Sequence, residues 1–250
     1  MPRGGLGLAW PRVIAALLEA SRFYELANKI MSLGTVGYLR RAAARGLRKC
    51  EGPLLDAGSG PGQMLVEALR AGAKPSVFVA LDPLEEMLRL IGGVDELALE
   101  RVRGVFERLP LRSGAFECVA TSFALRDALD VYRALRELSA VVGPGGRLVI
   151  LELHRPREPV RRILVELYFN LAPRIAGAIV AGHRGLKLYG ALPLTMRLLP
   201  PGRLYEAVLR KLGLIASSRL FFASSVAITV GVKPLSRARP AAASGDPDLR

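Results

Sequence analysis

Apolar residues in the central part of the chain follow two spacings, and each spacing predicts a different kind of element. Short apolar runs of strand length are followed by segments whose apolar residues recur at helical spacing. The strand-like runs are 53–57, 76–81, 102–106, 116–122 and 147–153, and the helix-like segments are 63–71, 84–91 and 128–141. This alternation predicts an α/β fold with a mostly parallel sheet and helices on both of its faces.

The two ends of the chain differ from this centre. Residues 1–50 show helical spacing from Val13 through Leu26 and Met31, which predicts an N-terminal helical lid segment. Residues 215–222 and 226–232 are strand-like and predict an antiparallel hairpin at the sheet edge. Residues 234–250 are rich in Pro, Ala, Ser and Arg and predict a disordered tail. We therefore expect one main domain over 51–233, with a substrate-side insertion at about 155–214.

Composition supports one folded domain and narrows the chemistry. Hydrophobic residues make up 51% of the 250 residues, which suits a compact α/β protein. The chain has two cysteines, Cys50 and Cys118, far apart in sequence, and two histidines. We expect neither a disulfide framework nor a metal site, and a reducing, cytoplasmic setting fits.

The net charge of +14 is unevenly distributed along the chain. Residues 1–50 carry a net +7, 51–150 a net −3, 151–233 a net +9 and 234–250 a net +1. Basic flanks attract nucleic acid, an anionic membrane surface or a phosphorylated substrate, although a solvated arginine-rich surface is an equally simple interpretation. The longest apolar stretch, 163–182, contains Glu166, Pro173 and Arg174, so we expect no transmembrane helix.

A glycine-rich loop follows the first predicted strand and carries Asp56, Gly58, Gly60 and Gly62. Glycines allow the backbone to approach a ligand closely, and the next helix presents free N–H groups at its start. Asp82 ends the second strand, where it can accept hydrogen bonds from ribose hydroxyls. The spacing differs from the dinucleotide fingerprint and lacks a P-loop lysine. A nucleoside ligand is indicated, and S-adenosylmethionine is favoured over NAD; a tight turn with an incidental aspartate is the alternative.

Several segments resemble the ubiquinone/menaquinone biosynthesis C-methyltransferase family of class I S-adenosylmethionine-dependent methyltransferases. The resemblance runs from about Tyr24 to Lys233. Its more specific parts are the Tyr24–Gly34 segment and Ser122-Phe123-Ala124-Leu125-Arg126; Pro144-Gly145-Gly146 is common to many methyltransferases. The resemblance implies a Rossmann-like fold with a seven-stranded sheet. It also implies a cofactor site, for which we expect Asp56, Ala57, Gly58, Ser59, Gly60, Gly62, Asp82, Pro83, Met87, Phe106 and Ser122.

The sequence departs from the family pattern at positions that bear on the substrate. Asp127 stands where the family has Asn after the arginine, and Gln63 replaces an acid after the cofactor glycines. Val105 occupies a position near the adenine that is usually acidic or an amide. Ala191 and Leu194 replace a Tyr and a Glu on the substrate side. These changes leave cofactor binding in place and put the identity of the acceptor in doubt.

The resemblance implies transfer of a methyl group from S-adenosyl-L-methionine to a ring carbon, leaving S-adenosyl-L-homocysteine. Arg126 is a candidate for stabilising a phenolate or organising a water, or else a structural ion pair with Asp127 or Asp130. His154 is a candidate base, or a hydrogen-bonded structural histidine. Tyr24 is a candidate cover for the methyl group, or an aromatic in the lid core.

These features leave several functions open. The leading hypothesis is methylation of a prenylated (hydro)quinone; the alternatives are methylation of another lipid or small molecule, and a non-catalytic cofactor-binding scaffold. The apolar and basic segment 163–214 is interpreted as a substrate cover that could touch an anionic membrane at the inner face, or as ordinary helix packing. A homodimer remains open. Nucleic acid ranks last as a substrate, because no base-flipping motif or attached binding module accompanies the charge.

Overall fold

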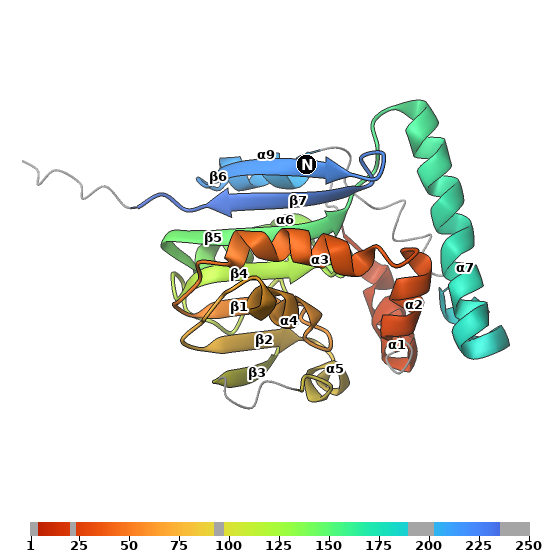
Figure 1. The fold of residues 1–250 in the computed structure, drawn as a ribbon, viewed down its shortest axis with the longest axis horizontal. Helices are drawn as coiled ribbons and strands as arrows, with labels where there is room; N and C mark the ends of the chain where they lie inside the picture. The colour runs from red at the N-terminus through yellow and green to blue at the C-terminus, as the bar shows by residue number, and fades with distance from the viewer. Residues whose placement is uncertain (1–4, 21–23, 93–97, 190–202, 236–250) are drawn as a thin grey trace, which may run out of the picture.

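The computed structural model describes residues 5–20, 24–92, 98–189 and 203–235. Its centre is a seven-stranded sheet in the order β3-β2-β1-β4-β5-β7-β6 (Figure 1). The first five strands in the chain are parallel, β7 is antiparallel to β5, and β6 is antiparallel to β7. The predicted fold class and C-terminal hairpin are therefore confirmed. The strands are β1 Leu54–Ala57, β2 Phe78–Asp82, β3 Leu99–Arg103, β4 Phe116–Ser122, β5 Val142–Leu153, β6 Ile215–Phe221 and β7 Val226–Val232.

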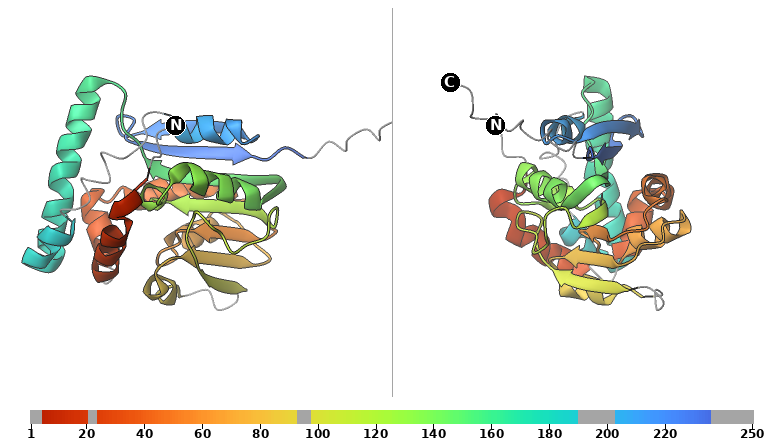
Figure 2. Two further views of the ribbon diagram at one scale, coloured as in Figure 1. Left: turned by 180° about the vertical axis from the view of Figure 1, so that it is seen from behind. Right: turned by 90° about the vertical axis from the view of Figure 1, so that its left-hand side faces the viewer.

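Helices cover both faces of the sheet and one of its ends. Helices α3 and α4 pack on one face and α6 and α9 on the other, while α1, α2 and α7 stand beyond the carboxyl ends of the parallel strands (Figures 1 and 2). The helices are α1 Trp10–Ala20, α2 Tyr24–Met31, α3 Val36–Ala44, α4 Gln63–Arg70, α5 Glu85–Arg89, α6 Val131–Val141, α7 Pro159–Tyr189 and α9 Leu204–Lys211, with 3-10 turns η1 Gly7–Ala9, η3 Arg45–Leu47 and η4 Leu125–Asp127.

The hydrophobic core is divided by the sheet into two clusters. Successive side chains of a strand point to opposite faces, so Leu54 joins the cluster under α3 and α4 while Leu55 joins the one under α6 and α9. Every residue of β1 and β2 is buried. This double burial explains why the central strands read as continuous apolar runs rather than as alternating patterns.

Two predicted elements are shifted in the structure. The strand expected at 102–106 is β3, which spans Leu99–Arg103; it lies at the sheet edge, and its half-exposed residues supply no apolar run to mark its bounds. The strand expected at 147–153 begins earlier, because β5 spans Val142–Leu153; its pairing with β4 shifts register between Phe116 and Cys118.

The prediction that the cysteines stay unpaired is wrong. Cys50 and Cys118 form a disulfide, with Cα atoms 6.2 Å apart. Cys118 lies in β4 opposite Leu54 of the neighbouring β1, and Cys50 comes just before β1, so the parallel pairing brings together residues 68 positions apart. The sulfur atoms are thus committed to each other, although the Glu117 carboxylate lies nearby. The pairing also removes the cysteine-based argument for a reducing setting.

Helix α7 covers the apolar stretch 163–182, for which the sequence predicts no transmembrane helix. The apolar run continues through Pro173 as one helix, with a break in helical geometry at Ala181 and Gly182. By length and composition alone, its part Pro159–His183 could cross a membrane, with a mean hydropathy of 1.5. The expected tail lies outside the described residues from position 236 onward.

Candidate functional site

The glycine-rich loop lies at the carboxyl end of β1, between β2 and β4. Its backbone is fastened to β2, because the N–H groups of Gly58 and Ser59 donate to the Leu81 carbonyl at 2.7 and 3.1 Å. Gly58 has φ +68°, and a Cβ there would lie 2.4 Å from the Ala124 Cβ. Only glycine fits both the conformation and the space, so this loop can bring bare backbone against a ligand.

Asp82 fixes the loop from the end of β2. One carboxylate oxygen accepts a hydrogen bond from the Gly60 N–H at 2.9 Å, and the other accepts one from the Leu84 N–H, also at 2.9 Å. Burial raises the pKa of Asp82, and these two backbone hydrogen bonds partly oppose the rise. Each oxygen keeps a second acceptor position, so Asp82 can hold the loop and still accept from a ligand hydroxyl.

Asp56 is buried without a protein partner. Neither of its carboxylate oxygens has a hydrogen-bond partner among the described residues. Burial raises its pKa to about 7, the nearby Arg40 lowers it and Asp82 raises it further. A buried carboxylate that lacks donors is costly in a finished structure, so this position calls for a ligand that brings a donor or a positive charge.

Arg40 supplies the complementary charge beside Asp56. It lies on α3, is 5% exposed and pairs with Glu25 of α2 at 3.5 Å. Its Nε has no hydrogen-bond partner among the described residues. Arg40 and Asp56 both line a small cavity of about 20 Å³ beside the glycine-rich loop. The cavity is lined by Arg40, Asp56, Gly58, Ser59, Gly60, Pro61, Gln63, Met64 and Ser122. A zwitterionic amino-acid group matches this pair of opposite charges.

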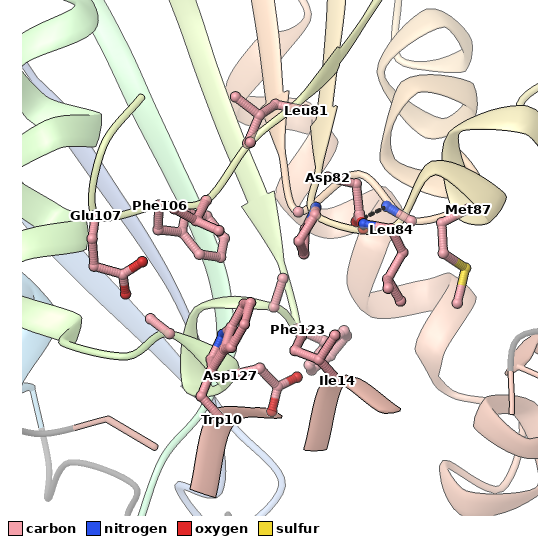
Figure 3. A pocket seen from close by; sticks show the side chains of 17 residues that line it. Trp10, Ile14, Leu81, Asp82, Leu84, Met87, Phe106, Glu107, Phe123 and Asp127 are labelled. Carbon is pink, nitrogen blue, oxygen red and sulfur yellow. Dashed lines mark hydrogen bonds between the residues drawn. The ribbon is translucent and has the colours of Figure 1, made fainter. Parts of the chain in front are cut away.

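A second cavity of about 70 Å³ continues from the same loop toward β2 and β4. Figure 3 shows Trp10 and Ile14 of α1 facing Phe106 and Asp82 across it, with Asp127 beside Trp10. Its remaining lining includes Gly58, Gly60, Leu81, Pro83, Leu84, Met87, Val105, Glu107, Phe123 and Ala124. The apolar walls suit a base, and the Asp82 carboxylate at the end of β2 suits ribose hydroxyls; Glu107 and Asp127 add two further carboxylates to the lining.

A third cavity, of about 370 Å³, lies between α2, α3 and α7. Its lining is mostly apolar, and Arg126 is the one charged residue among the described residues that line it. It is lined by Asn28, Met31, Ser32, Leu33, Thr35, Val36, Leu39, Phe123, Arg126, Leu153, Leu164, Val165, Tyr168, Phe169, Pro173, Phe222, Ser225 and Val226. This volume and lining suit an apolar molecule that carries one acidic or polar group.

Phe123 lines both the 70 Å³ and the 370 Å³ cavities, so the two meet at its side chain. Its φ of +55° is unusual for an aromatic residue and is held by its N–H, which donates to the Leu151 carbonyl at 2.8 Å. The Phe123 carbonyl in turn accepts a hydrogen bond from the Arg126 guanidinium. Strained backbone of this kind concentrates at functional sites.

Arg126 is held between two carboxylates. Its guanidinium lies 3.3 Å from Glu152 and 3.7 Å from Asp127, and its backbone N–H donates to Glu152 at 3.1 Å. Burial raises the pKa of Asp127 to about 6, and Arg126 opposes that rise. Asp130 instead caps α6 by accepting from the Arg133 N–H at 3.0 Å. The ion pair with Asp127 that was one alternative is therefore present, and Arg126 still reaches the apolar cavity.

The structure brings most of the predicted site residues together but not all of them. Asp56, Gly58, Ser59, Gly60, Asp82, Pro83, Met87, Phe106 and Ser122 line the two smaller cavities. Gly62 begins α4 behind the loop, and Ala57 lies in the core. His154 is fully buried against Tyr205 and lines none of the three cavities, which favours its structural interpretation. Tyr24 begins α2, but its side chain lies outside the described residues.

Three contributors to the site were missed in the sequence. Trp10 is the sole tryptophan but lies outside the resemblance, and Arg40 stands among other arginines of residues 1–50 without a distinguishing pattern. Asp127 was noted as a departure from the family pattern and as an ion-pair partner for Arg126, but it also lines the 70 Å³ cavity with Trp10 (Figure 3). Each depends on a contact between distant segments that spacing cannot reveal.

Comparisons with known proteins bear on the family of this chain. A model of the ubiE/COQ5 methyltransferase family matches residues 12–233. The demethylmenaquinone methyltransferase of Deinococcus radiodurans is 34% identical over 171 residues, which cover 66% of this chain and 70% of that protein. The one from Mycobacterium marinum is 36% identical over 172 residues, covering 68% and 72%. The one from Thermus thermophilus is 29% identical over 220 residues, covering 86% and 99%.

Solved structures share the fold at low sequence identity. A chain from the complex between the Haloferax volcanii Trm112 methyltransferase activator and a putative methyltransferase matches with a TM-score of 0.60 and 17% identity, covering 88% of this chain and 96% of that one. A possible histamine N-methyltransferase from Thermotoga maritima matches with a TM-score of 0.56 and 16% identity, covering 86% and 97%. These matches bear on the fold alone.

Proposed function

The chain belongs to the ubiE/COQ5 methyltransferase family, and from this membership and its cavities we propose that it methylates the ring of a prenylated hydroquinone. Within that family it is an S-adenosylmethionine-dependent methyltransferase. The relatives above are named for demethylmenaquinone, which is the acceptor class that we propose here. The observation that carries the proposal is that the 70 Å³ cavity beside Asp82 and the apolar 370 Å³ cavity, which Arg126 lines, share Phe123.

The residues beside the loop fit S-adenosyl-L-methionine. We propose that the unpartnered Asp56 carboxylate binds the ammonium of its amino-acid end and that Arg40 binds the carboxylate. Asp82 then accepts from the ribose hydroxyls, while Pro83, Met87 and Phe106 flank the adenine. The 70 Å³ cavity is smaller than the roughly 300–1,000 Å³ of typical ligand pockets. Trp10 and Ile14 of α1 must therefore move outward when the cofactor enters.

The acceptor side supports an apolar ring with a lipid tail. A cavity of about 370 Å³ holds a ring and the start of a tail, and the open side between α2 and α7 gives the remaining tail an exit. The basic flanks suit delivery of the substrate at the anionic inner face of a membrane, where we place the enzyme in the cell. The mostly apolar lining suits an apolar ring better than a nucleic-acid base.

When bound, the cofactor would supply an electrophilic methyl group: the sulfur–methyl bond breaks as the ring carbon takes the methyl, S-adenosyl-L-homocysteine leaves, and the hydrogen of that ring carbon is released as a proton. Arg126 binds the oxygen of the ring next to that carbon and stabilises it as a phenolate, which makes the ring carbon nucleophilic. The Asp127 and Glu152 carboxylates hold the guanidinium in place. Phe123 sets the distance between the two cavities, and the apolar lining excludes water from the reacting groups.

Methyl transfer to defined acceptors tests this proposal. The protein is incubated with methyl-labelled S-adenosylmethionine and one of four acceptors: a demethylated prenylated hydroquinone kept reduced, the same ring with a truncated tail, an unrelated phenolic lipid, or RNA. We expect label in the first two, with one methyl added to a ring carbon by mass spectrometry. Label only in the phenolic lipid or in RNA would show that the acceptor belongs to another class. Cofactor binding without label in any acceptor would favour the role of a non-catalytic cofactor-binding scaffold.

A further inference from the structure

We propose that the outer face of α7 docks on the surface of an anionic lipid bilayer, and that the acceptor cavity opens toward the bilayer there. The docking depends only on the exposed surface of α7. The opening of the cavity rests on the function proposed above.

The outer face of α7 carries an apolar stripe along most of its length. Successive members are three or four residues apart, so they lie on one side of the helix, and each is more than half exposed. The stripe consists of Val160, Leu164, Leu167, Leu171, Ile175 and Ile179. A continuous exposed apolar surface of this kind marks a contact with a partner or with a membrane.

The position of α7 leaves this stripe uncovered. The helix packs on α1 and α2 through its other side, where Pro173 and Ala176 are buried. Figures 1 and 2 show α7 at the margin of the molecule, with α1 and α2 between it and the sheet. The stripe therefore points away from the body of the protein, as a surface that lies on a membrane must.

The charge around the stripe favours an anionic bilayer over other occupants. Residues 155–183 carry five Arg and two Glu, a net charge of +3. Arg157, Arg161, Arg162 and Arg174 are all exposed. Acidic lipid headgroups match such a rim, whereas a second copy of this chain would bring the same arginines against their counterparts.

An interfacial position suits α7 better than a membrane-spanning one. Spanning would carry Arg174 and Glu166 into the hydrocarbon, which is costly, and would separate α7 from α1 and α2. Lying flat, the helix buries the stripe among the headgroups and acyl chains and leaves its arginines at the level of the phosphates.

The acceptor cavity reaches the surface beside this stripe. Leu164 belongs to the stripe and also lines the 370 Å³ cavity, as does its exposed neighbour Tyr168. The Tyr168 hydroxyl donates a hydrogen bond to the Met31 carbonyl, which ties α7 to α2 beside the cavity. A lipid-soluble acceptor can thus pass from the bilayer into the cavity between α2 and α7 without crossing water.

Vesicle binding tests the docking directly. The full chain is sedimented with phosphatidylcholine vesicles and with vesicles that also contain phosphatidylglycerol. The test variant is Leu167→Glu/Ile175→Glu on the stripe. The matched control is Leu90→Glu/Ile215→Glu, which makes the same charge change at residues of similar exposure outside α7. Circular dichroism melting and binding of S-adenosylhomocysteine establish that both variants fold.

We expect the wild type and the control to bind the anionic vesicles at least about tenfold more tightly than the neutral ones, and added salt to weaken this binding. The stripe variant should lose at least about tenfold of it. Equal binding by the stripe variant, or no binding by the wild type, would overturn the docking. A wild-type dimer that the stripe variant converts to monomer, without vesicle binding, would identify the face as a contact between copies.

A soluble acceptor separates this inference from the proposed function. With a tail-truncated hydroquinone in solution, the stripe variant should methylate at the wild-type rate, whereas with the long-tailed acceptor in anionic vesicles it should be at least about tenfold slower. If the wild type methylates neither acceptor but binds the vesicles, the function fails and the docking stands. If both acceptors are methylated equally by the variant, the lipid-side opening fails.

Discussion

The two halves of the site are built differently on either side of Phe123. On the cofactor side, β1, β2 and β4 end in backbone turns and short polar side chains, and Gly58, Asp56 and Asp82 have little freedom to move. On the acceptor side, α2, α3 and α7 offer apolar side chains from three helices, with Arg126 as the single charge. The contrast suggests that the cofactor is recognised by fixed positions and the acceptor by an adaptable apolar surface.

If that contrast holds, single substitutions on the cofactor side should lower cofactor affinity more than those on the acceptor side. The largest loss of cofactor affinity is expected for Gly58→Val, whose side chain would clash with Ala124 and Phe106 at φ +68°. Left-handed strain of about 1–2 kcal/mol and overpacking of about 1–3 kcal/mol displace the loop. Affinity for S-adenosylhomocysteine, measured by calorimetry, should fall about 100-fold. Gly92→Ala, which meets open space, is the control and should bind normally; equal binding by both variants would contradict the account.

Substitution of Arg126 tests the role of the charged residue that lines the acceptor cavity. Arg126→Gln should lower kcat by about 10²–10³-fold, since it removes a stabiliser of developing negative charge, and leave the cofactor affinity within about threefold. Removing one partner of a buried ion pair costs about 3–5 kcal/mol of stability. Arg126→Gln/Glu152→Gln should therefore recover thermal stability without recovering turnover. Recovery of both would reduce Arg126 to a structural role.

Substitution of Asp56 tests how the protein binds the charged amino-acid end of the cofactor. Asp56→Asn removes a charge-assisted hydrogen bond worth about 1.5–3 kcal/mol, so affinity for S-adenosylhomocysteine should fall about 10–100-fold. Because burial raises the folded-state pKa to about 7, the stabilising protonated form is lost as pH rises from the unfolded value near 4 to about 7. The stability of the unliganded wild type should fall across that window in thermal melts. If Asp56→Asn shows the same fall of stability with pH, then another titrating group causes that fall.

Asp127 links the two halves, because it faces the cofactor cavity and pairs with Arg126. Its pKa of about 6, raised by burial, means that it becomes ionised and holds Arg126 only above that pH. We expect kcat to rise with pH through about 6 in the wild type. In Asp127→Asn, kcat should no longer rise with pH through about 6. Its value at higher pH should differ from that of the wild type by no more than about tenfold, because the amide keeps the size and some of the hydrogen bonding of the carboxylate. An unchanged limb in the variant would exclude Asp127 as its origin.

The smallest effect is expected at Trp10, which closes the cofactor cavity from α1. Trp10→Leu removes an aromatic contact of about 0.5–1.5 kcal/mol, so the KM for S-adenosylmethionine should rise a few-fold with little change in kcat. As the sole tryptophan, Trp10 also reports on α1. Its fluorescence should change on addition of S-adenosylhomocysteine, and an unchanged spectrum would contradict the outward movement of α1.

The same contrast explains what could be predicted from the sequence. The buried strands and the loop were predictable, because continuous apolar runs, glycine spacing and the terminal aspartates Asp56 and Asp82 are local signals. Helix α7 was only partly predictable, since its apolar residues do not tell whether they face a core, a cavity or a membrane. The Cys50–Cys118 pairing, Arg40 and Trp10 were missed, because each acts across segments that only the folded sheet brings together.

The central claim is that the cofactor and the acceptor bind in separate cavities that meet at Phe123. The most direct test is a structure of the protein with S-adenosylhomocysteine and a prenylated hydroquinone bound together. The account predicts adenosine beside Asp82, with Trp10 moved outward, the cofactor sulfur directed past Phe123, and the ring beside Arg126 with its tail leaving between α2 and α7. A ring bound away from Arg126, or an adenosine outside the Asp82 cavity, would contradict it.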